Sequence, residues 1–258
     1  MTNIPSYKIV DVNSSNIDKY PQAICFINPK NEHFHHKVEW LKQEFKNGLK
    51  IKLLFVEGIK RAVGFVEYTV GENCYRAVSA KGYTFIHCIW TNGKKFQRQG
   101  LGKMLLDEVA KDAKGSFGIC TVASKKAFMA ENSIFVKNGF KQVKKVGSEQ
   151  LLVKVFKADA PLPYFLPLSK VPAKGLCFTY SLQCPWVGRF AAEAKEFCKT
   201  FSIKAEFVLI KDAHQAQRAG SIYSCLTLSY NGKILADRYI SLTRFKNILK
   251  KEKIWGNK

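Results

Sequence analysis

A short basic loop with two glycines is the stretch of this 258-residue chain best suited to bind an anion. Its residues are Gln97, Arg98, Gln99, Gly100, Leu101, Gly102 and Lys103. A helix that starts in this loop would leave backbone N–H groups without partners, and its dipole would add partial positive charge. The glycines would let a ligand approach the backbone, and Arg98 and Lys103 would add charge. The loop therefore predicts a seat for a phosphate or pyrophosphate.

The segments on either side of the loop must position it. Tyr83 to Trp90 is rich in β-branched and aromatic residues, which predicts a buried strand. After the loop, apolar residues recur at Leu101, Met104, Leu105 and Val109, which is the spacing of one helical face. A P-loop would need glycine at 97 and Ser or Thr at 104, and a dinucleotide fingerprint would need glycine at 105. Neither pattern is present, because these positions hold Gln, Met and Leu.

The pattern that fits, Q/R-x-x-G-x-G/A between a strand and a helix, resembles the coenzyme A loop of the Gcn5-related N-acetyltransferase (GNAT) family. A second stretch, Phe135 to Phe140, resembles the Y-x-x-x-G-F ending of that family. The two motifs are in register, and the resemblance covers about residues 5–157. The alternative is an ordinary strand-to-helix turn with incidental glycines.

The order of the expected elements agrees with this resemblance. Before the loop we expect strands at Tyr7–Val12, Ile51–Val56 and Ala62–Val70 and a helix at Glu32–Lys46. After it we expect a strand at Phe117–Ala123, a helix at Phe128–Lys137, and strands at Val143–Lys145 and Gln150–Phe156. The resemblance implies the α/β (α+β) fold class, with a mixed, largely antiparallel sheet flanked by helices.

The resemblance also implies a cofactor and an activity. It implies acetyl-CoA as donor and an amine of a small molecule or peptide as acceptor. It places the backbone of Cys88, Ile89 and Trp90 against the thioester and the pantetheine arm. Many family members carry a tyrosine at the position of Phe135 that protonates the leaving thiolate. Here that role passes to another group or to water, or is absent.

Three titratable side chains near the loop are candidates for the base that deprotonates the amine. They are Glu67, His87 and Tyr83. An unperturbed imidazole has a pKa of roughly 6.5, which suits a base near neutral pH and favours His87. The alternative is that each is a hydrogen-bonded structural residue of a strand. Cys120 is a weaker candidate nucleophile, because a cysteine among apolar residues is usually inert.

A proline-rich stretch, 158–175, predicts a linker between two domains. The resemblance therefore gives a GNAT domain at 1–157 and a second domain at 176–258. The second domain has the strand and helix order of a minimal thioredoxin-like fold, with Cys184-Pro185 at a predicted helix start. Val187 replaces the second cysteine of a dithiol motif, so binding is favoured over redox chemistry. The combination resembles the bacterial YoaP-type acetyltransferases.

Composition limits the remaining classes. No apolar run is long enough to span a bilayer, and the N-terminus lacks a signal-peptide pattern, so we expect a cytoplasmic protein. Eight scattered cysteines and the His33, His35, His36 cluster predict neither a disulfide framework nor a metal site. The net charge of +22 is shared by both halves, which makes nucleic acid an improbable partner. The alternatives are a coenzyme A-binding module without turnover, a monothiol thioredoxin-like protein and an RNA binder. The sequence does not predict the oligomeric state.

Overall fold

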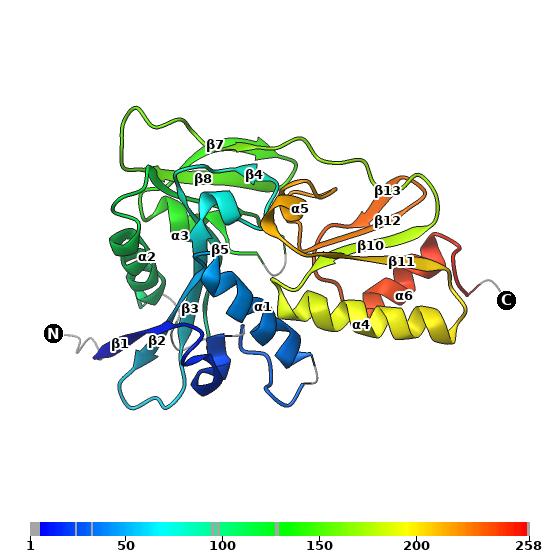
Figure 1. The fold of residues 1–258 in the computed structure, drawn as a ribbon, viewed down its shortest axis with the longest axis horizontal. Coiled ribbons are helices and arrows are strands. Elements are labelled where there is room, and N and C mark those ends of the chain that lie inside the picture. Colours follow the sequence, from blue (N-terminus) through cyan, green and yellow to red (C-terminus); the bar gives the residue numbers. More distant parts are fainter. Residues whose placement is uncertain are drawn as a thin grey trace. The chain divides into compact units, whose positions relative to one another are not determined.

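A computed structural model describes residues 6–23, 25–31, 33–93, 96, 99–126 and 129–256 (Figure 1). The chain separates into two compact units. The first comprises residues 1–31, 41–74 and 79–165, and the second comprises 32–40, 75–78 and 166–258. Each unit has its own main sheet and its own hydrophobic core.

Strands and helices alternate along the chain in an order typical of a mixed α/β protein. The strands are β1 (Tyr7–Val12), β2 (Lys50–Val56), β3 (Gly64–Val70), β4 (Val78–Ser79), β5 (Thr84–Thr91), β6 (Gly118–Ala123), β7 (Lys141–Val146), β8 (Glu149–Val155), β9 (Tyr164–Phe165), β10 (Leu176–Ser181), β11 (Ala205–Ile210), β12 (Leu226–Tyr230) and β13 (Lys233–Ala236). The helices are α1 (Phe34–Lys46), α2 (Leu101–Asp112), α3 (Asn132–Val136), α4 (Pro185–Thr200), α5 (Ala213–Gln217) and α6 (Leu242–Lys251). Short 3-10 helices lie at Ile17–Lys19, Pro21–Ala23 and Gly71–Asn73.

The first unit is built on a seven-stranded sheet in the order β1-β2-β3-β5-β6-β8-β7. Its neighbours are antiparallel except for β5 and β6, which run parallel. Antiparallel neighbours need only a tight turn, whereas a parallel pair needs a crossover, which α2 supplies here. The predicted mixed, largely antiparallel sheet flanked by helices is confirmed.

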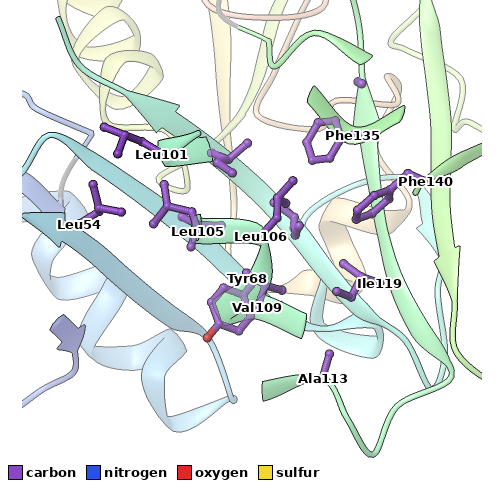
Figure 2. Packing of buried hydrophobic residues seen from close by; sticks show 14 of the residues in the cluster. Leu54, Tyr68, Leu101, Leu105, Leu106, Val109, Ala113, Ile119, Phe135 and Phe140 are labelled. Carbon is purple, nitrogen blue, oxygen red and sulfur yellow. The ribbon is translucent and has the colours of Figure 1, made fainter. Parts of the chain in front are cut away.

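Helix α2 packs on one face of this sheet with the apolar side that the sequence predicts. Leu101, Leu105, Leu106 and Val109 are buried in a cluster that also contains Tyr68 of β3. Figure 2 shows these leucines directed at the strands, with Phe135 and Phe140 at one end of the cluster. Fully burying a leucine or valine stabilises a fold by about 1.5–3 kcal/mol, so this face fixes the helix on the sheet.

The second unit has a four-stranded sheet in the order β11-β10-β12-β13. β10 runs parallel to β11 and antiparallel to β12, and β12 and β13 form a hairpin. Asn231 and Gly232 have φ angles of 47° and 80° at its tip, the left-handed backbone that a tight two-residue hairpin turn requires. Aromatic rings fill the core: Phe178 stacks on Phe207 at 4.3 Å and contacts Phe245 edge-on at 5.3 Å.

Two expected elements differ from the structure. The helix expected over Phe128–Lys137 is much shorter as α3, because Glu131 is extended (φ −70°, ψ 148°). The amide of Ser124 donates to the Ala130 carbonyl at 3.3 Å, which closes a loop where helix was expected. Glu32, the expected start of α1, and Phe128 lie outside the described residues. The proline-rich stretch contains the short strand β9.

The C-terminal end of α2 is tied to the sheet by a polar contact. The Tyr68 hydroxyl donates to Asp112 Oδ2 at 2.6 Å, and Lys50 Nζ donates to the same oxygen at 3.0 Å. Burial acts to raise the pKa of Asp112, but these hydrogen bonds and nearby Lys52 outweigh it, so the pKa is below its usual value. Burial, and then the Asp112 carboxylate, raise the pKa of the Tyr68 phenol.

These two shifts predict stability that falls at both pH extremes. A lowered carboxyl pKa gives stability that is present above the ordinary value and lost as pH falls through the folded one. A raised phenol pKa gives stability that is lost as pH rises beyond about 10, because only the unfolded tyrosine then ionises. We expect Tyr68→Phe to cost about 1.5–3 kcal/mol at neutral pH and to flatten the alkaline loss.

Urea unfolding between pH 3 and 11 would measure both effects. Tyr7→Phe is the matched control, because the Tyr7 side chain is 48% exposed on β1. An alkaline loss of stability that is equally steep in wild type and in Tyr68→Phe would contradict the assignment.

Candidate active site

Strands β5 and β6 pair over only three residues and then part. The ladder joins Thr84, Phe85 and Ile86 to Ile119, Cys120 and Thr121. At its end the Thr121 hydroxyl donates to the Ile86 carbonyl at 2.9 Å. β5 continues to Thr91 and remains paired with β3 on its other edge. In the part of the chain that the structure describes, the edge of Ile89–Thr91 that faces β6 is therefore open.

A cavity of about 530 Å³ occupies the place where the strands part. This volume is typical of small-molecule sites. One wall is the end of β5, and the other is the segment that follows β6. The lining residues described are Ile89, Trp90, Thr91, Lys125, Lys126, Met129, Ala130, Glu131, Ser133 and Ile134. The end of β5 and two lysines thus border the same cavity.

The second wall is held in place by polar and apolar contacts. Asn132 donates from its side-chain amide to Gln150 Oε1 of β8 at 2.9 Å. Lys126 Nζ lies 3.7 Å from Glu149 Oε1, the carboxylate at the start of the same strand. Phe135 is fully buried and meets Phe140 edge-on at 5.3 Å, so its ring belongs to the core.

The first turn of α2 lies beside this cavity. Gly100 precedes the helix with φ 78° and ψ 0°, a left-handed conformation that favours glycine, and it has no side chain with which to cap the helix. Gly102 packs against the second wall, since a Cβ at this position would lie 2.4 Å from Ile134 Cδ1. The N-terminal end of α2, which carries the positive end of the helix dipole, thus packs against a residue that lines the cavity, as a phosphate site requires.

The other residues of the predicted loop differ in their burial and contacts. Gln97 and Arg98 lie outside the described residues, and Gln99 is exposed. Leu101 is buried in the core, so only its backbone can serve a ligand. Lys103 Nζ donates to Asp107 Oδ2 at 2.6 Å on the exposed face of α2. In the strand before the loop, Cys88 is half-buried, Ile89 is buried and Trp90 is 50% exposed.

A β-bulge at His87 re-aims the end of β5. Tyr68 of β3 pairs with Ile86, but Glu67 pairs with Cys88, so His87 is one residue extra. Bulges of this kind bend a strand and are common next to active sites. Ile86 and Ile89, three residues apart, both enter the cluster beneath α2. In a regular strand they would point to opposite faces.

The structure brings together two of the three candidate bases. His87 Nδ1 lies 3.3 Å from Glu67 Oε1, and both side chains are almost fully buried. Val66 and Tyr68, which flank Glu67, belong to the cluster beneath α2, so Glu67 points to the opposite face of the sheet. A carboxylate at this distance stabilises the protonated imidazole.

Tyr83 is not part of this pair. It precedes β5 at the end away from the cavity and packs edge-on against Phe117 at 5.9 Å. Its hydroxyl has no hydrogen-bond partner among the described residues. Burial, and then Cys120, raise the pKa of the phenol, which makes ionisation harder.

The other singled-out groups lie elsewhere. Cys120 is fully buried on β6, and burial raises the pKa of its thiol well above the usual value, as expected of an inert cysteine. Cys184 is the N-cap residue of α4, with Pro185 at the first helical position and Val187 buried. Among the described residues no group of three potential metal ligands occurs, so His33 and His36 are not part of one.

The fold and site define a mixed α/β protein with a glycine-containing helix start beside a cavity between parting strands. Comparison with known proteins gives the class. Residues 20–140 match the acetyltransferase (GNAT) family. An uncharacterized N-acetyltransferase, YoaP of Bacillus subtilis (strain 168), is 24% identical over 249 residues, covering 93% of this chain and 97% of that protein.

Solved structures are also similar to this chain. PaiA N-acetyltransferase from Thermoplasma acidophilum, in complex with coenzyme A, is 15% identical with a TM-score of 0.43, and the match covers 58% of this chain and 99% of that one. Arabidopsis thaliana NAA60, in complex with acetyl-CoA, is 16% identical with a TM-score of 0.40, covering 58% and 98%.

The chain therefore carries a GNAT acetyltransferase domain. Acyl transfer is the activity of this class, and acetyl-CoA is its usual donor. In the described residues no helix combines the length and apolar character needed to cross a bilayer.

The sequence pointed to the loop but missed the second wall of the cavity. Lys125 and Ser133 belong to no motif, and they reach the site only because β5 and β6 part. The sequence feature that could point to them is their position, because they follow a buried strand that runs parallel to β5.

The contact between Gly102 and Ile134 predicts a coupled pair of mutations. Gly102→Ala should gain about 1 kcal/mol in helix propensity but lose about 1–3 kcal/mol by pressing on Ile134 Cδ1. Ile134→Val lacks that carbon, so in its background Gly102→Ala should be neutral or stabilising. Urea unfolding of the four variants measures the coupling, and additivity within about 0.5 kcal/mol would contradict the contact.

Proposed function

We propose that this protein is an acetyl-CoA-dependent N-acetyltransferase that transfers the acyl group to an amine of a small molecule or peptide. One observation carries the proposal: the end of β5 lines the cavity, and the first turn of α2 packs through Gly102 against Ile134, which lines the same cavity. The first suits an extended amide-bearing arm, and the second suits a diphosphate. Coenzyme A joins these two groups in one molecule.

The residues present fit this donor. The backbone of Cys88, Ile89 and Trp90 would hold the pantetheine arm and polarise the thioester carbonyl from the open edge. The amides of the loop Gln97–Lys103 would hold the diphosphate, with Gly100 and Gly102 keeping the approach free of side chains. Bound acetyl-CoA supplies an activated acyl group, and the chain supplies position and charge.

The buried pair of Glu67 and His87 is the proposed base. It lies on the sheet face opposite α2, so the amine would approach from that face while the donor occupies the cavity. His87 would take the proton from the amine, directly or through one water, and Glu67 would stabilise the imidazolium. Tyr83 is the remaining candidate, and its place before β5 favours it least.

We also propose the domain division and compartment expected from the sequence: a GNAT domain at 1–157, a linker at 158–175 and a thioredoxin-like domain at 176–258. The sheet order β11-β10-β12-β13, with one parallel pair and a terminal hairpin, supports the last assignment. Cys184 then occupies the active-site position of that fold. No disulfide joins the eight cysteines, all of which lie in the described ranges, and this is consistent with a cytoplasmic protein.

A second candidate function is coenzyme A binding without turnover. The burial of Phe135 in the core favours it, because this position offers no proton to a leaving thiolate. Thiol release from acetyl-CoA across a panel of amines separates the two functions. Tight binding with no release by any amine would favour the binding module.

The diphosphate seat predicts a charge-sensitive affinity for coenzyme A. Gly100→Asp should weaken binding at least tenfold, about 1.4 kcal/mol, because a carboxylate would face the diphosphate. Isothermal titration calorimetry with coenzyme A measures this. Gly58→Asp is the matched control: Gly58 has φ 75°, Gly100 has φ 78°, and a Cβ at either would meet nothing within 4 Å. No heat of binding in the wild type, or equal loss in both variants, would refute the seat.

The proposed base predicts a selective loss of kcat. His87→Gln should lower kcat by about 10²-fold, the usual contribution of a general base, with little change in affinity for coenzyme A. Glu67→Gln should have a smaller effect of the same kind, and Tyr83→Phe should have little effect. Steady-state rates with the most reactive amine of the panel, together with calorimetry, measure both quantities. A larger loss in Tyr83→Phe than in His87→Gln would reverse the assignment.

A further inference from the structure

The buried ring of Phe135 leaves open which group stabilises the thiolate that departs from the donor. The cavity offers a small set of polar side chains for this task. They are Thr91, Lys125, Lys126, Glu131 and Ser133. A carboxylate would repel the developing negative charge, and a hydroxyl gives a neutral hydrogen bond. An ammonium group gives a charge-assisted bond, which is roughly twice as strong.

The parting of β5 and β6 brings both lysines to the cavity. The ladder pairs Thr84 with Ile119 and Ile86 with Thr121. Beyond Ile86 the strands part and the bulge at His87 ends this offset, but Trp90 and Lys125 both line the cavity that opens between them. Lys125 thus borders the same cavity as the stretch of β5 that would hold the thioester.

The two lysines also differ in their partners. Lys126 Nζ lies 3.7 Å from Glu149 Oε1, so its charge is partly balanced. Lys125 is exposed, and no carboxylate lies within ion-pair distance of it among the described residues. Glu131 borders the same cavity but does not form a salt bridge with Lys125. The ammonium of Lys125 is therefore available to a new anion.

Resting on the proposed function, we infer that Lys125 is a catalytic residue whose ammonium group stabilises the leaving thiolate of coenzyme A. The amine nitrogen bonds to the carbonyl carbon and loses its proton to His87. The carbon–sulfur bond breaks, and its electron pair stays on sulfur. Lys125 Nζ–H donates a hydrogen bond to that sulfur, which later takes a proton from water.

This assignment is testable without knowledge of the acceptor, because coenzyme A itself carries the thiol. A cation within about 4–6 Å lowers the pKa of an acid by about one unit or more, so the bound thiol should ionise at least tenfold more readily than in free coenzyme A. Ultraviolet difference absorbance of the thiolate, measured against the protein with S-methyl-coenzyme A, follows this ionisation. The S-methyl compound cancels the signal of protein tyrosines.

Lys125→Ala should return the thiol to its free behaviour, and Lys125→Arg should largely keep the wild-type value. Lys126→Ala is the matched control, an adjacent lysine of the same charge, and should leave the thiol unchanged. Unchanged ionisation in Lys125→Ala, or equal shifts in the two alanine variants, would overturn the inference. So would a loss of affinity for coenzyme A with no change in its thiol, because Lys125 would then act on another part of the molecule.

The kinetic consequence distinguishes this inference from the proposed function. Lys125→Ala should lower kcat with acetyl-CoA by tenfold or more, and the loss should shrink for acetyl thioesters whose thiols are more acidic. If wild type binds coenzyme A but shows an unperturbed thiol, the inference about Lys125 fails alone. If wild type does not bind coenzyme A, the proposed function fails.

Discussion

The site depends on one topological constraint, the parallel pairing of β5 with β6 in a sheet whose other pairs are antiparallel. A parallel pair requires a crossover, and here the crossover is α2. The helix must then begin where β5 ends, and the segment after β6 must leave the sheet at that same edge. The two walls of the cavity come from segments that are far apart in sequence. They lie together with the helix start because of the way β5 and β6 are connected.

Parting of the two strands turns this meeting point into a cavity. The bulge at His87 changes the direction of β5 immediately after its last pair with β6. An open strand edge is normally a liability, since unpaired amides and carbonyls attract other chains. Here that edge lies inside a cavity with lysines on the opposite side, where a ligand with its own amides can satisfy it. The bulge thus positions His87 beside Glu67, and the strand that follows it borders the cavity.

The sequence predicts the parts of this arrangement that are local. The spacing of Leu101, Leu105 and Val109 predicts the buried face of α2, and the position of Gly100 predicts where the helix starts. Periodicity carries no information about register, so neither the extra residue at His87 nor its contact with Glu67 could be predicted. Lys125 belongs to no motif, and it shares a cavity with Trp90 only once the two strands have paired and parted.

The replacement of tyrosine by Phe135 has a structural reason that bears on the chemistry. Phe135 packs against Phe140 with its ring wholly in the core, where a phenol hydroxyl would need a buried partner. Phenylalanine avoids that cost and strengthens the end of the cluster beneath α2. The leaving thiolate must then be stabilised from the side of the cavity that faces solvent. A lysine can supply the stabilising charge there. Its ammonium group is hydrated and sits on a flexible stem, so it needs no buried partner when the site is empty. Packing and catalysis are thereby separated, because the aromatic ring stabilises the fold and the exposed cation serves the leaving group.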